Sequence, residues 1–168
     1  MRRKMTPRSK RFQALGLLGW LALVFVAAAV GALASVDAAS FYLLLNKPAW
    51  APPASAFGPV WSVLYALMGV SAWLVWREQC KLVGWALSLF IAQLLANALW
   101  SWLFFAWRLG VASFADVLLL LVLIVLTITA FFRVNRLAAL LMVPYLAWVC
   151  LASALTWSVW QANPTLFQ

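Results

Sequence analysis

Side chains that could carry out chemistry are scarce in this chain, and their scarcity limits the reactions open to it. The 168 residues contain no histidine, and the acids are Asp37, Glu78 and Asp116. Imidazole bases, carboxylate pairs and ordinary zinc or iron sites therefore lack the residues they need. We expect no metal site, and the composition argues against a hydrolase.

Asp116 is the one acid inside a long apolar segment, where an ionisable side chain usually has a function. A second interpretation is local. Ser113 precedes Asp116 by three residues, a spacing typical of a helix N-cap followed by an acid in the first turn. We favour the capping interpretation, in which a helix begins just after Ser113.

Amide and aromatic side chains form a more informative pattern. One stripe, at intervals of four, three and four, consists of Gln93, Asn97, Trp100 and Phe104. Similar stripes in two other segments consist of Trp61, Tyr65 and Met68, and of Tyr145, Trp148, Ala152 and Thr156. A cavity for a flat aromatic ligand is one explanation, and hydrogen bonding between packed helices is the other. Periodicity does not decide between them.

The elements that must carry these stripes are membrane-spanning helices. Hydrophobic residues make up 68% of the chain and charged residues 9%, which leaves too few polar groups to cover a soluble protein. Five apolar runs can each supply the roughly 20 residues of a spanning helix. They cover residues 12–36, 49–76, 82–107, 109–132 and 137–168. We predict an all-α integral membrane protein with one five-helix domain over residues 12–168, preceded by a basic cytoplasmic segment over residues 1–11.

The distribution of positive charge predicts the orientation. Of 12 Lys and Arg residues, only Lys47 and Arg108 lie on the side opposite the N-terminus. The positive-inside rule then places the N-terminus inside and the C-terminus outside. We interpret the basic residues as topology signals, so we expect no nucleic-acid partner. The basic start and first apolar run also resemble a signal peptide, but the run from Phe12 to Val30 exceeds the usual core of about 7 to 15 residues.

Depth along the predicted helices places the stripes in the outer half of the membrane. At about 1.5 Å per residue, Trp61 and Thr156 would lie just beneath the outer surface, with Asn97, Gln93 and Trp148 deeper. We expect these stripes to line a cavity below the proline-rich loop at residues 46–61.

A ridge of small side chains predicts a homodimer. It consists of Gly84, Ser88, Ala92 and Ala96, which recur every four residues on the segment that carries Gln93. Such a ridge lets another helix backbone approach closely. Packing against a second span of the same chain is the alternative.

Six short segments, in a fixed order, carry a family resemblance. They are KPAWAPP, FGPVWSVLYALMG, SAWLVW, AQLLANALWSWLFF, ADVLLL and PYLAW. Over about residues 15 to 163 the chain resembles the TspO, or tryptophan-rich sensory protein, family, whose mitochondrial relatives are the translocator proteins. The resemblance implies five transmembrane helices, commonly a dimer, and a pocket for porphyrins, haem and benzodiazepine-site ligands. It also implies that the first loop acts as a lid over that pocket.

Stripes and resemblance together give a set of ligand-binding candidates. They are Trp50, Trp61, Tyr65, Gln93, Asn97, Trp100, Phe104, Tyr145, Trp148 and Ala152. The resemblance implies that Trp50 faces the ligand and that a side chain larger than Ala152 would intrude on it. The sterol-recognition pattern of some relatives is absent, because no Lys or Arg follows Tyr145, so sterol binding is doubtful.

We therefore expect a receptor-like protein that binds porphyrin or haem in an outward-facing pocket and requires no cofactor. Its role would be the sensing, trafficking or disposal of tetrapyrroles. Transport of tetrapyrroles and light-dependent oxidative degradation of porphyrin are the alternatives. The long basic N-terminus and the missing sterol pattern favour a bacterial inner membrane, with lipid as the surrounding partner.

Overall fold

Five helical segments in the computed structural model, which describes residues 9–167, are long and apolar enough to cross a membrane. They are α1 (Lys10–Leu33), α3 (Ala54–Trp76), α4 (Val83–Ser101) with the π-helical turn η1 (Trp102–Ala106), α5 (Gly110–Val134), and α6 (Arg136–Leu141) with α7 (Val143–Ala162). The prediction of an all-α, five-span membrane protein is confirmed. Most of the predicted basic segment at residues 1–11 lies outside the described residues. Lys10 and Arg11 already belong to α1, which begins after Ser9, whose Oγ accepts a hydrogen bond from the Phe12 amide.

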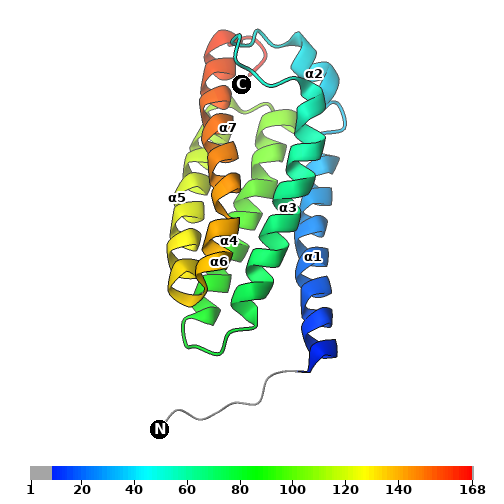
Figure 1. Ribbon diagram of the computed structural model, residues 1–168. Coiled ribbons are helices and arrows are strands. Elements are labelled where there is room, and N and C mark those ends of the chain that lie inside the picture. Colours follow the sequence, from blue (N-terminus) through cyan, green and yellow to red (C-terminus); the bar gives the residue numbers. More distant parts are fainter. Residues whose placement is uncertain (1–8, 168) are drawn as a thin grey trace.

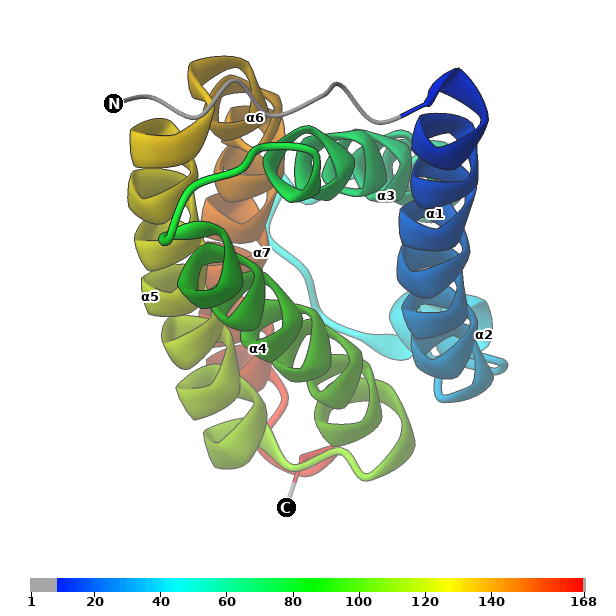
Figure 2. The same cartoon turned by 90° about the horizontal axis from the view of Figure 1, so that it is seen from below.

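The helices form an elongated bundle with α1 at one edge and α5 at the opposite edge (Figures 1 and 2). Helix α1 packs against α3 and α4, while α5 packs against α4, η1, α6 and α7. A close approach joins α1 to α3 at Gly69, where a Cβ atom would lie only 3.3 Å from the Cα atom of Leu21. Glycine therefore fixes the spacing of these two helices.

Large apolar side chains fill the bundle toward the end that lies away from α2. Phe90 and Phe131 are fully buried, and their rings stack with centroids 5.9 Å apart. Met68 and Ile124 are also fully buried in the same cluster. This end of the bundle is a packed core, so the opposite end is where a ligand can be accommodated.

The end that carries the C-terminus is closed by the short helix α2 (Ala38–Leu44) and the loop that follows it (Figure 1). The sequence did not predict α2. Tyr42 of α2 donates a hydrogen bond from Oη to the carbonyl oxygen of Pro52 at 2.7 Å. Burial raises the pKa of the Tyr42 hydroxyl above its usual range, which keeps it a neutral donor.

A second attachment ties the loop to the end of α7. The Asn163 side chain accepts from the amide of Asn46 at 2.8 Å and donates to the carbonyl oxygen of Asn46 at 3.0 Å. The buried Phe167 ring packs against Phe41 of α2 and Phe104 of η1, with centroids 5.8 and 5.3 Å away. Residues after α7 thus hold both α2 and the loop that follows it.

The capping interpretation of Ser113 is wrong. Helix α5 begins at Gly110, and Ser113 is a buried residue of its first turn whose Oγ donates to the carbonyl oxygen of Gly110 at 2.9 Å. Asp116 consequently lies two turns inside the helix and is only 6% exposed. The start of α5 is fixed by packing, because Gly110 leaves room for the Trp160 ring, which a Cβ atom would approach to 2.2 Å.

The predicted dimer ridge has two different environments along α4. Gly84 and Ser88 are exposed, and no atom lies within 4 Å of the position of a Cβ atom on Gly84. Ala92 is half-buried, and Ala96 is buried in the core of its own chain. Packing within the chain therefore accounts for Ala96, and contact of the remaining ridge with a second copy stays a prediction.

Candidate functional site

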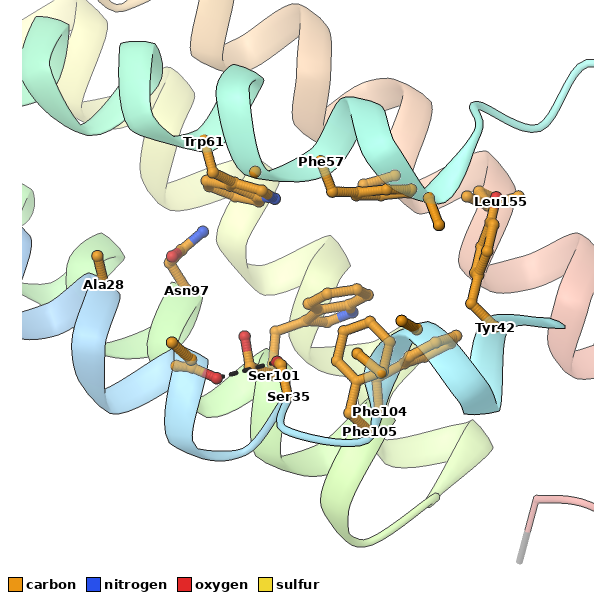
Figure 3. A pocket seen from close by; sticks show the side chains of 18 of the residues that line it. Ala28, Ser35, Tyr42, Phe57, Trp61, Asn97, Ser101, Phe104, Phe105 and Leu155 are labelled. Carbon is orange, nitrogen blue, oxygen red and sulfur yellow. Dashed lines mark hydrogen bonds between the residues drawn. The ribbon is translucent and has the colours of Figure 1, made fainter.

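A cavity of about 490 Å³ lies in the half of the bundle beneath the α2 loop. Its volume falls within the range of roughly 300 to 1,000 Å³ typical of small-molecule sites. Side chains from α1, α2, α3, α4, η1 and α7 line it, and Figure 3 shows most of them. The cavity is the place where five of the seven α-helices and the π-helical turn meet.

Aromatic rings make up much of the cavity wall. Phe57 and Trp61 project from α3 on one side, and Phe104 and Phe105 lie across the cavity from them (Figure 3). Trp100 stacks on Phe104 with centroids 5.0 Å apart and planes at 16°, while Phe105 lies edge-on to Trp100 at 5.7 Å. These rings present flat apolar surfaces, which suit a flat apolar ligand.

The π-helical turn explains how neighbouring residues in the sequence can both face the cavity. Phe104 and Phe105 lie within η1, where the wider turn replaces the regular α-helical spacing. Such turns occur often at functional sites. The sequence stripe predicted Phe104 at this wall but not Phe105.

Polar groups at the cavity surface are few. Tyr65 donates from Oη to Oδ1 of Asn97 at 2.6 Å, and both residues line the cavity. Ser35 and Ser62 also line it, but their hydroxyls donate to the carbonyl oxygens of Gly31 and Gly58, each four residues earlier in the chain. The Asn97 amide, labelled in Figure 3, and the Trp100 Nε1 atom, which has no partner among the described residues, thus have hydrogen-bonding capacity for a ligand.

Six of the ten predicted ligand-binding residues line the cavity. They are Trp61, Tyr65, Asn97, Trp100, Phe104 and Ala152. Thr156, the last residue of the predicted α7 stripe, lines it as well.

Three other predicted residues lie behind the cavity wall rather than on it. Gln93 and Tyr145 are fully buried, and the Tyr145 hydroxyl donates to Oε1 of Gln93 at 2.9 Å. Trp148 packs edge-on against the cavity-lining ring of Phe57, with centroids 5.8 Å apart. These residues support the site without forming its surface.

Trp50 lies in the loop between α2 and α3 with 49% of its surface exposed, and it is not part of the cavity lining. Its contact with a ligand stays a prediction, and it requires the loop to move toward the cavity. The loop attachments through Tyr42 and Asn163 hold it in its present position.

The sequence stripes missed the side of the cavity formed by α1 and α2. Its residues are Phe25, Ala28, Gly31, Ala32, Ser35, Ala38, Ala39 and Tyr42. A signal for part of it was present, because Ala28, Gly31, Ala32 and Ser35 follow the helical spacing of three, four and seven. Small side chains on one face leave room beside a helix, and here that room is part of the cavity.

Comparisons with known proteins agree with this architecture. A sequence model of the TspO/MBR family matches residues 20–161. The tryptophan-rich protein TspO of Chlorobaculum tepidum is 42% identical over 128 residues, which cover 74% of this chain and 80% of that protein. The translocator protein of Homo sapiens is 38% identical over 126 residues, covering 73% and 75% respectively. Protein CrtK of Rhodobacter capsulatus is 38% identical over 146 residues, covering 82% and 86%. This five-helix chain belongs to the TspO/MBR family.

Proposed function

We propose that the protein binds porphyrin- or haem-type tetrapyrroles in the cavity beneath the α2 loop, as a membrane receptor that serves their sensing, trafficking or disposal. The observation that carries this proposal is the cavity itself, which has about 490 Å³ of space between aromatic walls. Family membership supports the same proposal.

Recognition would depend mainly on stacking. A flat macrocycle between Phe57 and Trp61 on one side and Trp100 and Phe104 on the other would contact rings on both of its faces. The Asn97 amide would give orientation through one hydrogen bond.

The cavity offers no conventional axial ligand to a haem iron. No His, Cys or Met occurs among its lining residues, and both lining tyrosines, Tyr42 and Tyr65, already donate hydrogen bonds within the protein. We therefore propose that the macrocycle is held by its ring system, so that metal-free protoporphyrin and haem bind with similar affinity. A haem iron would keep its own redox chemistry, and these side chains would supply binding and exclusion of water.

Acidic substituents of the ligand would point toward the loop. The lining residues include no Lys or Arg. Lys47 and Arg108 lie at the loop end instead, where their charged groups sit over the rings of Tyr42 and Phe41 at 4.7 and 4.6 Å. Carboxylates placed near these cations would remain hydrated, which avoids the cost of burying them.

Transport is the second candidate, because the human relative is named a translocator protein. The packed inner core opposes a fixed passage, since Met68, Phe90 and Phe131 are fully buried below the cavity. Transport would need the bundle to open, and movement of protoporphyrin across sealed vesicles that contain the protein would demonstrate it. Light-dependent degradation of a bound porphyrin beside Trp61 and Trp100 is a third possibility, for which illumination of the complex should yield a new absorbing product.

The binding proposal is tested by adding protoporphyrin to the purified protein in the dark. We expect saturable quenching of tryptophan emission, because several indoles adjoin the cavity. Linear quenching without saturation would contradict the proposal. We further propose that the protein acts as a homodimer in a bacterial inner membrane, with the cavity facing outward.

A further inference from the structure

Asp116 is a buried acid that the proposed ligand site does not use. It lies two turns inside the spanning helix α5 and is 6% exposed. Its Oδ2 atom is buried and has no hydrogen-bonding partner among the described residues. A carboxylate in this position would be both desolvated and unsatisfied, which is among the most costly arrangements in a membrane protein.

Among residues 9–167, the elements packed against α5 place no Lys or Arg beside Asp116. The elements packed against α5 are α4, η1, α6 and α7. Helices α4 and α7 and the turn η1 contain no Lys or Arg, and Arg136 of α6 and Arg133 of α5 lie at the far, inner end. Arg108 precedes α5 at the outer end, where its guanidinium group lies over the Phe41 ring. Helix α7 also carries two titratable side chains, the fully buried Tyr145 and the exposed Cys150.

Two hydrogen-bonded pairs on successive turns of α4 lead from the cavity wall to Tyr145. Tyr65 bonds to Asn97 at 2.6 Å, and Tyr145 bonds to Gln93 at 2.9 Å. Gln93 and Asn97 lie one turn apart on α4, and Tyr145 belongs to α7, which packs against α5, the helix of Asp116. The Nε2 atom of Gln93 is buried and has no partner within residues 9–167, so a free donor lies beside these bonds. Together with Asp116, these polar side chains come from four helices, α3, α4, α5 and α7.

We infer that Asp116 is a neutral carboxylic acid, a proton-binding site within the membrane that is coupled to the ligand cavity through Tyr145, Asn97 and Tyr65. Protonation removes the buried charge and gives the acid a donor of its own. A change at the cavity wall then alters the environment of the acid, since buried hydrogen bonds in a low-dielectric interior polarise one another. This inference concerns the protein without ligand and does not rest on tetrapyrrole binding.

Infrared spectroscopy tests both parts of the inference on the full chain. The protein is purified at neutral pH in a detergent that carries no carbonyl group, and the C=O band of a protonated carboxyl is recorded. We expect this band in the parent protein and its loss in Asp116→Asn. Absence of the band from the parent overturns the inference, because an ionised Asp116 gives no such band.

The coupling is tested by a matched pair of cavity variants. Tyr65→Phe removes the hydroxyl that bonds to Asn97, whereas Ser62→Ala removes a cavity hydroxyl that bonds only within α3. We expect the band to shift in Tyr65→Phe, to shift further in Tyr145→Phe, and to stay in place in Ser62→Ala. Equal band positions in the parent, Tyr65→Phe and Tyr145→Phe overturn the coupling. If Ser62→Ala shifts the band as much as Tyr65→Phe does, the coupling does not pass through Tyr65 and Asn97. A structural role of Asp116 alone would not move this band.

Discussion

Tyr65 of α3 donates a 2.6 Å hydrogen bond to Oδ1 of Asn97 on α4, at the surface of the cavity. This bond joins two helices that both line the cavity, and it fixes the amide that a ligand would meet. A polar contact of this kind within the membrane has no water to replace it when it is broken. It is therefore a point at which stability and binding can be measured together.

The Tyr65 and Asn97 pair should show strong coupling in stability. Tyr65→Phe and Asn97→Leu each leave a buried partner unsatisfied, and each should lower the free energy of unfolding by about 1–3 kcal/mol. The double variant should lose less than the sum, because it leaves neither partner behind. Denaturation of the parent, the two single variants and the double variant in one detergent completes this double-mutant cycle. If the two single losses of unfolding free energy simply add in the double variant, a direct bond is contradicted.

The two hydrogen bonds between the Asn163 side chain and the Asn46 backbone should control access to the cavity. Asn163→Ala removes both bonds to the backbone of Asn46, so the loop over the cavity should open more often. Stopped-flow measurements with protoporphyrin should then show faster association and faster dissociation. Asn135→Ala is the control, since Asn135 caps α6 and bonds to Glu78 at the end of the bundle away from the cavity. Equal kinetics in both variants would argue against a role of the loop as a lid.

Reporter fusions test the orientation. The charge distribution predicts the turn between α5 and α6 inside, and the α2–α3 loop and the chain end after α7 outside. A reporter that requires the cytoplasm should therefore be active after Asn135 and inactive after Phe167. Activity at the chain end would reverse the orientation and would turn the cavity toward the cytoplasm.

The exposed part of the small-residue ridge should mediate the dimer. Ser88→Leu adds bulk at an exposed position of α4, so it should weaken association of two copies without disturbing the core. Ala154→Leu adds similar bulk at an exposed position of α7 and should not affect it. Cross-linking in bilayers measures the fraction of dimer in each variant, and an unchanged fraction in Ser88→Leu would favour an interface elsewhere.

Much of the fold follows from the sequence because the membrane imposes simple rules. Apolar run lengths and the placement of basic residues specify five spans, and the structure contains them. The start of α5 was mispredicted because the fit of Trp160 against Gly110, a tertiary contact, determines it. Helix α2 and the turn η1 were not predicted, since local sequence does not reveal where packing will widen a helix or fold a loop.

The cavity was predicted in part for a related reason. A stripe identifies the face of a helix but not the depth to which its side chains are covered, so Asn97 and Gln93 looked equivalent. Asn97 lines the cavity, whereas Gln93 bonds to Tyr145 behind it. The contribution of α1 consists of small residues such as Ala28 and Gly31, which form a site only through the space they leave.

Ala152 provides the most direct test of the cavity as the binding site. It lines the cavity on α7, while Ala154, two residues further on, is exposed on another face of the same helix. Protoporphyrin titrations in the dark, followed by tryptophan quenching, should be compared for Ala152→Phe and Ala154→Phe. We expect Ala152→Phe to weaken binding at least about tenfold, or about 1.4 kcal/mol, and Ala154→Phe to bind like the parent. Equal affinity in both variants and the parent would contradict binding in this cavity.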